Sequence, residues 1–159
     1  MKINKLGKFI ISVDICLLAG FFGSIFTTPS IPNWYASLNK PSFNPPNWLF
    51  APVWTLLFIL MGIALFLMWQ KGLKKKGVKK ALGFFIIQLI FNVLWSFFFF
   101  KFHSPFWALL DIAVLWLFIL LTTIKFFKIN KLSGILLLPY LLWVSFASIL
   151  NYTVYKLNL

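Results

Sequence analysis

Amide and aromatic side chains recur at one-turn spacing within two long apolar segments of this 159-residue chain. The two sets are Gln88, Asn92 and Ser96 with the adjacent Trp95, and Tyr140, Trp143, Ala147 and Asn151. Residues three or four apart share one face of an α-helix, and polar groups in hydrocarbon usually face the interior of a helix bundle. We therefore expect both faces to line one pocket, where indole rings stack on a flat apolar ligand and amides orient it. The alternative for Gln88 and Asn92 is hydrogen bonding that holds neighbouring helices together.

A proline-rich and tryptophan-rich stretch separates the first two apolar segments. Residues 34–55 contain three tryptophans, four prolines and one lysine. Proline fixes φ and lacks a backbone donor, so the stretch predicts an extended run that ends near Trp48. The prolines responsible are Pro41, Pro45 and Pro46. We expect residues 28–47 to form a rigid lid over the helices.

Side chains that carry out bond-breaking chemistry are scarce. His103 is the single histidine and Cys16 the single cysteine, so we expect neither a metal site nor an internal disulfide. Asp111 lies in the fourth apolar segment, where either a functional role or a capping role is open. The sequence has no nucleophile elbow, P-loop or glycine-rich dinucleotide motif. Hydrolysis and phosphoryl transfer are therefore excluded.

The composition is that of an integral membrane protein. Hydrophobic residues make up 62% of the chain, charged residues 11%, and the mean hydropathy is +0.94. Five apolar segments are long enough to cross a bilayer as helices with all backbone groups paired. Their predicted bounds are about 8–27, 48–69, 81–100, 105–124 and 132–155. We predict an all-α bundle of five transmembrane helices, in a single domain over residues 1–159. Small residues on the first helix, such as Gly20 and Gly23, favour close helix packing or dimerisation.

The net charge of +13 reflects membrane topology. Five crossings place the N-terminus and the loops 70–80 and 125–131 on one side, together with 12 of the 15 lysines. The positive-inside rule then predicts a cytoplasmic N-terminus and an external lid. These lysines lie beside the membrane, so lipid headgroups are the expected partner and nucleic acid is not. The abundance of lysine and absence of arginine suggest a bacterial cytoplasmic membrane.

Several motifs resemble the TspO/MBR family, which includes the tryptophan-rich sensory proteins and the translocator proteins. They fall in order along residues 20–156, so membrane composition alone does not explain them. The motifs are Gly23-Ser24, Trp34-Tyr35-x-x-Leu38-x-Lys40-Pro41-x-Phe43-x-Pro45-Pro46-x-Trp48, Pro52-Val53-Trp54, Met61-Gly62, Gln88-Leu89-x-x-Asn92-x-x-Trp95, Trp107-Ala108-Leu109-x-Asp111 and Pro139-Tyr140-x-x-Trp143-x-x-Phe146-Ala147-x-x-Leu150-Asn151-Tyr152. Phe43 departs from the family pattern, where many members have tryptophan, and so does the lysine-rich second loop.

The resemblance implies five transmembrane helices, frequent homodimers, and a pocket under the first loop that binds porphyrin or haem, with no cofactor required. In animal members it also implies binding of cholesterol and of benzodiazepine-type ligands. The pocket would be formed by Tyr35, Pro45, Pro46, Trp54, Gln88, Asn92, Trp95, Trp143 and Ala147. Leu150, Tyr152 and Lys156 fit the weak cholesterol-recognition pattern.

The residues themselves favour the same ligand class. A porphyrin is a flat apolar plane with two carboxylates, and it needs aromatic walls, a few amides and a cation at the mouth, for which Lys40 is available. Three functions are open. The first is a tetrapyrrole-binding sensor or regulator in the membrane. The second is a light- and oxygen-dependent porphyrin-degrading enzyme, for which the resemblance implicates Trp54 and Trp143, and the third is a small-molecule transporter.

Overall fold

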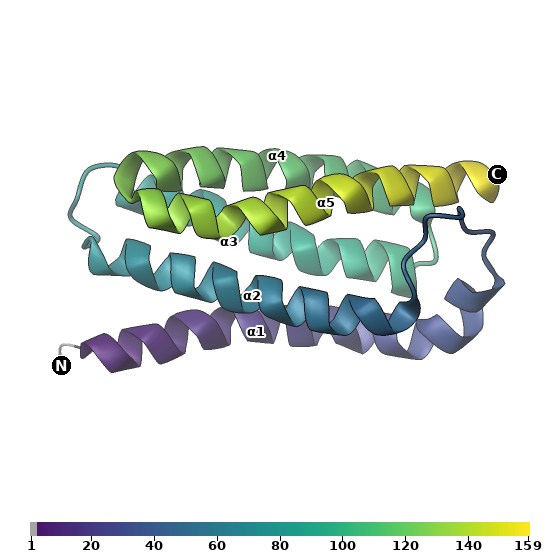
Figure 1. Ribbon diagram of the computed structural model, residues 1–159, viewed down its shortest axis with the longest axis horizontal. Coiled ribbons are helices and arrows are strands. Elements are labelled where there is room, and N and C mark those ends of the chain that lie inside the picture. Colours follow the sequence, from purple (N-terminus) through teal and green to yellow (C-terminus); the bar gives the residue numbers. More distant parts are fainter. Residues whose placement is uncertain (1–2) are drawn as a thin grey trace.

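The computed structural model describes residues 3–159 as five long α-helices that run side by side (Figure 1). The helices are α1 (Lys5–Ser30), α2 (Asn47–Gln70), α3 (Val78–Ser96), α4 (Pro105–Ile129) and α5 (Lys131–Leu157). Two π-helical segments, η1 (Ile31–Tyr35) and η2 (Phe97–Lys101), continue α1 and α3. All five helices are long and apolar enough to cross a membrane, and the described residues contain no strand. The predicted all-α bundle of five transmembrane helices is confirmed.

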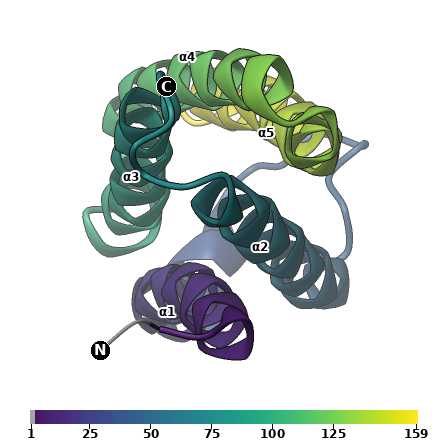
Figure 2. The same ribbon diagram turned by 90° about the vertical axis from the view of Figure 1, so that its left-hand side faces the viewer.

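The helices form two groups when the bundle is viewed along its axis. Helices α3, α4 and α5 form a curved row with α4 in the middle, and α1 and α2 lie on its concave side (Figure 2). Aromatic stacking joins the row, for example between Phe85 of α3 and Phe126 of α4, whose ring centroids are 5.7 Å apart. Because α1 packs against α2 and α3, and α2 packs against α1 and α5, a space between the two groups is bounded by four helices.

Glycines let α1 approach its neighbours closely. A Cβ atom at Gly62 would lie 2.6 Å from the Cα atom of Val13, and one at Gly20 would lie 2.6 Å from the ring of Phe58. Backbone and ring therefore occupy the space that a side chain would need. The prediction that Gly20 mediates close helix packing is confirmed, and these contacts join α1 and α2 from the middle of the bundle, at Gly20 and Phe58, toward the end remote from the lid, at Gly62 and Val13.

The predicted end of the fourth helix is wrong by several residues, whereas the predicted start of the fifth is off by one. Helix α4 was expected to stop at residue 124 but continues to Ile129, and α5 starts at Lys131. The loop predicted for 125–131 is therefore the single residue Asn130, whose side chain caps α5 by accepting a hydrogen bond from the backbone N–H of Leu132 at 3.1 Å. Hydropathy marks the end of the apolar run, whereas lysines are good helix formers and extend the helix into the interface.

The first loop is shorter than predicted. Residues 28–37 continue helically as the end of α1, the π-helical segment η1 and a final turn, although they contain Pro29 and Pro32. In a π-helical turn a carbonyl accepts from the N–H five residues later and not four. A carbonyl that would otherwise face a proline nitrogen, which has no hydrogen, can therefore bond to the next residue along. The non-helical part of the first loop is limited to residues 38–46, with a turn at Ser42 and Phe43, and we use the name lid for this segment. The prolines at its end do hold the chain extended, since Pro46 has φ −61° and ψ 143° directly before α2.

Candidate ligand-binding cavity

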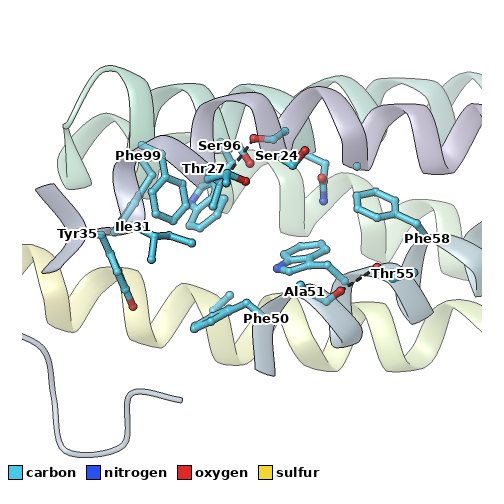
Figure 3. A pocket seen from close by; sticks show the side chains of 18 of the residues that line it. Ser24, Thr27, Ile31, Tyr35, Phe50, Ala51, Thr55, Phe58, Ser96 and Phe99 are labelled. Carbon is cyan, nitrogen blue, oxygen red and sulfur yellow. Dashed lines mark hydrogen bonds between the residues drawn. The ribbon is translucent and has the colours of Figure 1, made fainter. Parts of the chain in front are cut away.

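A cavity of about 430 Å³ lies between α1, α2, α3 and α5 (Figure 3). Its lining comprises residues from these helices and from η1 and η2, including Thr27, Ile31, Tyr35, Phe50, Trp54, Asn92, Trp95, Phe99, Trp143, Ala147 and Leu150. None of the lining residues carries a formal charge. The volume falls within the range of about 300–1,000 Å³ that is usual for small-ligand pockets.

Three tryptophans contribute the largest flat surfaces of this cavity. Trp54 stacks on Phe58 with ring centroids 5.7 Å apart, and Trp95 stacks on Phe99 at 5.2 Å. Trp143 makes an edge contact with Phe50 at 6.2 Å. Because neighbouring rings fix the indoles in this way, the cavity presents preformed aromatic faces to a ligand.

The polar stripe of α3 divides into a residue that faces the cavity and one that does not. The side-chain amide of Asn92 donates to the hydroxyl of Tyr140 at 2.9 Å, and that hydroxyl donates to the Oε1 of Gln88 at 2.8 Å. Asn92 lines the cavity, whereas Gln88 is buried between helices outside it. The alternative interpretation of Gln88, hydrogen bonding between helices, therefore agrees with its position.

A second hydrogen-bond chain fixes Trp95. Its indole N–H donates to the Oδ1 of Asn151 at 2.9 Å, and the amide of Asn151 donates to the carbonyl of Pro105 at 2.9 Å. The chain joins α3, α5 and the start of α4, so the orientation of the indole is set by three elements. This leaves the face of Trp95 as the surface available to a ligand.

The lysine of the lid is hydrogen-bonded to nearby backbone carbonyls. The Nζ of Lys40 donates to the backbone carbonyls of Tyr35 at 2.7 Å, Leu38 at 2.9 Å and Ala36 at 3.3 Å. These carbonyls lie at the C-terminal end of the first helix, where intrahelical donors run out and the Tyr35 carbonyl accepts only a long bond of 3.4 Å from the N–H of Leu38, so the ammonium group acts as a C-terminal cap. We expected Lys40 at the mouth of the pocket, but its ammonium group is bonded to backbone carbonyls at the end of the first helix, and Lys40 does not line the cavity.

The remaining predicted residues lie in three places. Pro45 and Pro46 belong to the lid and do not line the cavity. Leu150 lines the cavity, but Tyr152 is 49% exposed on the outer side of α5 and Lys156 is exposed near its end. The three residues of the cholesterol-recognition pattern therefore do not share one surface.

Sequence reasoning missed the contribution of α1 and of the phenylalanine run. Ser24, Thr27 and Ile31 line the cavity, although the small residues of α1 indicated only helix packing. Phe99 and Phe100 line it too, because the π-helical turn of η2 changes the register after Ser96. The sequence pattern of this run shows no periodicity that would have indicated the π-helical turn.

The titratable residues considered from sequence lie away from the cavity. His103 is exposed and stacks on Trp34 with centroids 4.6 Å apart. Asp111 is buried in α4, where neither carboxylate oxygen has a hydrogen-bond partner among the described residues. In residues 3–159, no group of three or more His, Cys, Asp or Glu residues is positioned to hold a metal ion.

Comparison with known proteins gives a consistent result over nearly the whole chain. The pattern of the TspO/MBR family matches residues 12–157. The chain is 49% identical over 146 residues to the tryptophan-rich protein TspO of Chlorobaculum tepidum, and this alignment covers 92% of each protein. The translocator protein of Homo sapiens is 37% identical, over 89% of this chain and 84% of that protein. The tryptophan-rich sensory protein of Cereibacter sphaeroides is 40% identical over 125 residues, which is 79% of this chain and 77% of that protein.

Proposed function

The chain belongs to the TspO/MBR family of integral membrane proteins, and we propose that it binds a tetrapyrrole, porphyrin or haem, in the cavity as a sensor or regulator. The observation that carries the proposal is the shape and chemistry of the cavity, an uncharged space of about 430 Å³ with three indoles in its wall. Planar aromatic ligands bind by burial and by stacking on such rings.

The polar groups of the cavity are suited to orienting a bound ligand and not to reacting with it. Asn92 has its amide N–H₂ tied to Tyr140 at 2.9 Å, while its carbonyl oxygen makes no hydrogen bond within residues 3–159. This acceptor is available to a hydrogen-bond donor on the ligand. A single fixed acceptor within an apolar site supplies specificity without a large desolvation cost.

An equilibrium titration tests the proposal. Protoporphyrin IX is added in the dark to the purified protein in detergent, and porphyrin absorbance and tryptophan fluorescence are followed together. Trp143→Ala removes an aromatic wall and should weaken binding by about 1–3 kcal/mol, or roughly 5-fold to 150-fold. Trp107→Ala is the matched control, because Trp107 is 49% exposed and does not line the cavity. Equal affinity of both variants and wild type would refute binding in this cavity.

A second candidate is light- and oxygen-dependent porphyrin degradation. Trp54 and Trp143 come from different helices, α2 and α5, yet line the same cavity. A porphyrin bound in the cavity could therefore contact an oxidisable indole, and such contact is what electron transfer between ring and side chain requires. The bleaching rate of bound pigment under illumination separates this activity from binding alone.

A further inference from the structure

We propose that the ligand reaches the cavity from the bilayer, through a gap between α1 and α2, and not from water through the lid. This inference rests on the proposed function, since it concerns the route to the same cavity. It also narrows the ligand to a flat amphiphile that partitions into the membrane. Exposure, hydrogen bonds and charge each support it.

The lining residues that are exposed all belong to two facing helices. They are Phe21, Ser24 and Thr28 of α1, and Asn47, Ala51 and Thr55 of α2. Every lining residue from α3, η2 and α5 is buried or half-buried. The cavity is thus open along one seam, which we call the α1/α2 gap and define by these six residues.

The α1/α2 gap lies at membrane depth. Its α2 side runs from Asn47 to Thr55, about 12 Å at 1.5 Å per residue. Trp48, which is 73% exposed, marks the interfacial end, where tryptophan is favoured. The gap closes at its deep end, where Gly20 lies against Phe58.

Two of the hydroxyl groups at the α1/α2 gap, those of Ser24 and Thr55, have satisfied donors. Ser24 Oγ donates to the Phe21 carbonyl at 2.7 Å, and Thr55 Oγ1 donates to the Ala51 carbonyl at 2.8 Å. Hydroxyls bonded back to their own helix are tolerated in hydrocarbon, because no donor is left unpaired. The gap is therefore compatible with direct contact with acyl chains at Ser24 and Thr55.

The lid, by contrast, is held closed on the water side. Asn39 N–H donates to the Oδ1 of Asn158, and the amide of Asn158 donates to the carbonyl of Asn39, both at 2.9 Å. From η1, the hydroxyl of Tyr35 donates to the Oδ1 of Asn44 in the lid at 2.8 Å. These bonds tie the lid to the end of α5 and to η1, so a route from water requires several hydrogen bonds to break.

Charge sets how the ligand lies in the cavity. The lining is neutral, and the one lysine of the lid is hydrogen-bonded to three carbonyls, so no cation faces the cavity to pair with a carboxylate. A charged group without a partner is costly in an apolar site. An amphiphile that slides in from the bilayer can bury its flat apolar part and keep its acidic edge at the interfacial end of the gap, beside Asn47.

Association kinetics in lipid nanodiscs test the route. Asn39→Cys with Asn158→Cys, in a Cys16→Ala background, locks the lid when the pair is oxidised. The association rate of protoporphyrin IX, followed by tryptophan quenching, should agree within about twofold between the oxidised and reduced forms. Loss of association on oxidation would overturn the proposal. Failure of wild type to bind protoporphyrin at all would instead refute the proposed function.

A pair of variants tests the gap itself. Ala51→Trp places an indole in the α1/α2 gap and should slow association about tenfold, whereas Leu56→Trp adds the same ring to an exposed position of α2 outside the cavity. Equal association rates of these two variants would contradict the route.

A measurement without any ligand covers the case in which variants fold poorly or porphyrin does not bind. A nitroxide on Thr55→Cys, in the Cys16→Ala background, should collide more with oxygen, which concentrates in hydrocarbon, than with a water-soluble nickel complex. The same label on Ser42→Cys, in the exposed part of the lid, should show the opposite order. Dominant nickel collisions at Thr55 would show that the gap faces water and would overturn the proposal.

Discussion

Asn92 and Gln88 share one hydrogen-bond partner but face different surroundings. Both bond to the hydroxyl of Tyr140, which accepts from Asn92 and donates to Gln88. Only Asn92 lines the cavity, and the Nε2 of Gln88 is buried without a partner among the described residues. The two residues therefore form a natural pair for separating a ligand contact from a packing contact.

Asn92→Leu should weaken porphyrin binding, while Gln88→Leu should not. Each substitution removes one partner of Tyr140, so the structural loss is similar in the two variants. Only Asn92→Leu also removes an acceptor that faces the ligand, which is worth about 1 kcal/mol, or roughly fivefold in affinity. Dark titrations of both variants make the comparison, and a loss of equal size in both would assign the effect to packing.

Substitution of the cavity tryptophans by phenylalanine separates binding from photochemistry. Trp54→Phe and Trp143→Phe keep an aromatic face but are much harder to oxidise, so dark affinity should fall little. Under light, bleaching of bound protoporphyrin should slow steeply in at least one variant. The rate for free pigment in detergent is the control. If wild type bleaches bound pigment no faster than this control, the enzyme function is excluded and the sensor function remains.

At the scale of elements, close packing of α1 against α2 determines where the cavity begins. Gly62→Ala should lower the thermal unfolding temperature in detergent, because the added Cβ would lie 2.6 Å from the backbone of Val13 and force the helices apart. Gly83→Ala is the matched control on α3, since its Cβ would meet nothing within 4 Å and alanine favours the helix by about 1 kcal/mol. An unchanged or higher unfolding temperature for Gly62→Ala would show that this contact does not limit stability.

Hydropathy and periodicity were sufficient to predict the elements but not their ends. Long apolar runs must be helical in a bilayer, so all five helices follow from the sequence. The continuation of α4 to Ile129 carries charged residues outside hydrocarbon, where hydropathy gives no signal. The continuation of α1 through Pro29 and Pro32 depends on a π-helical turn that no local pattern marks.

The candidate site was predictable to the extent that it depends on stripes of amides and aromatics. Asn92, Trp95, Trp143 and Ala147 do line one cavity, as the one-turn spacing on two helices suggested. The position of Lys40 was not predictable, because it depends on which carbonyls the end of the first helix leaves unpaired. The same holds for Ser24 and Thr27 of α1, whose small side chains suit packing and cavity lining equally well.

For the whole molecule, the distribution of lysine predicts orientation in the membrane. The start of α1, the loop between α2 and α3, and the junction of α4 with α5 lie at one end of the bundle, and the lid and the end of α5 lie at the other (Figure 1). Membrane-impermeant thiol labelling of intact cells should therefore modify Ser42→Cys but not Lys75→Cys, each in a Cys16→Ala background. Labelling of both positions from outside, or of Lys75→Cys alone, would reject a cytoplasmic N-terminus.

The central claim is that a flat apolar ligand occupies the cavity between the two groups of helices. The most direct measurement compares the affinity of two tryptophan variants for protoporphyrin IX in the dark. Ala147→Trp fills the cavity from α5 and should weaken binding by more than about tenfold, whereas Ile149→Trp adds the same ring at a position that is 60% exposed and outside the cavity, and should bind like wild type. If folded Ala147→Trp binds protoporphyrin as tightly as Ile149→Trp, the ligand does not occupy this cavity.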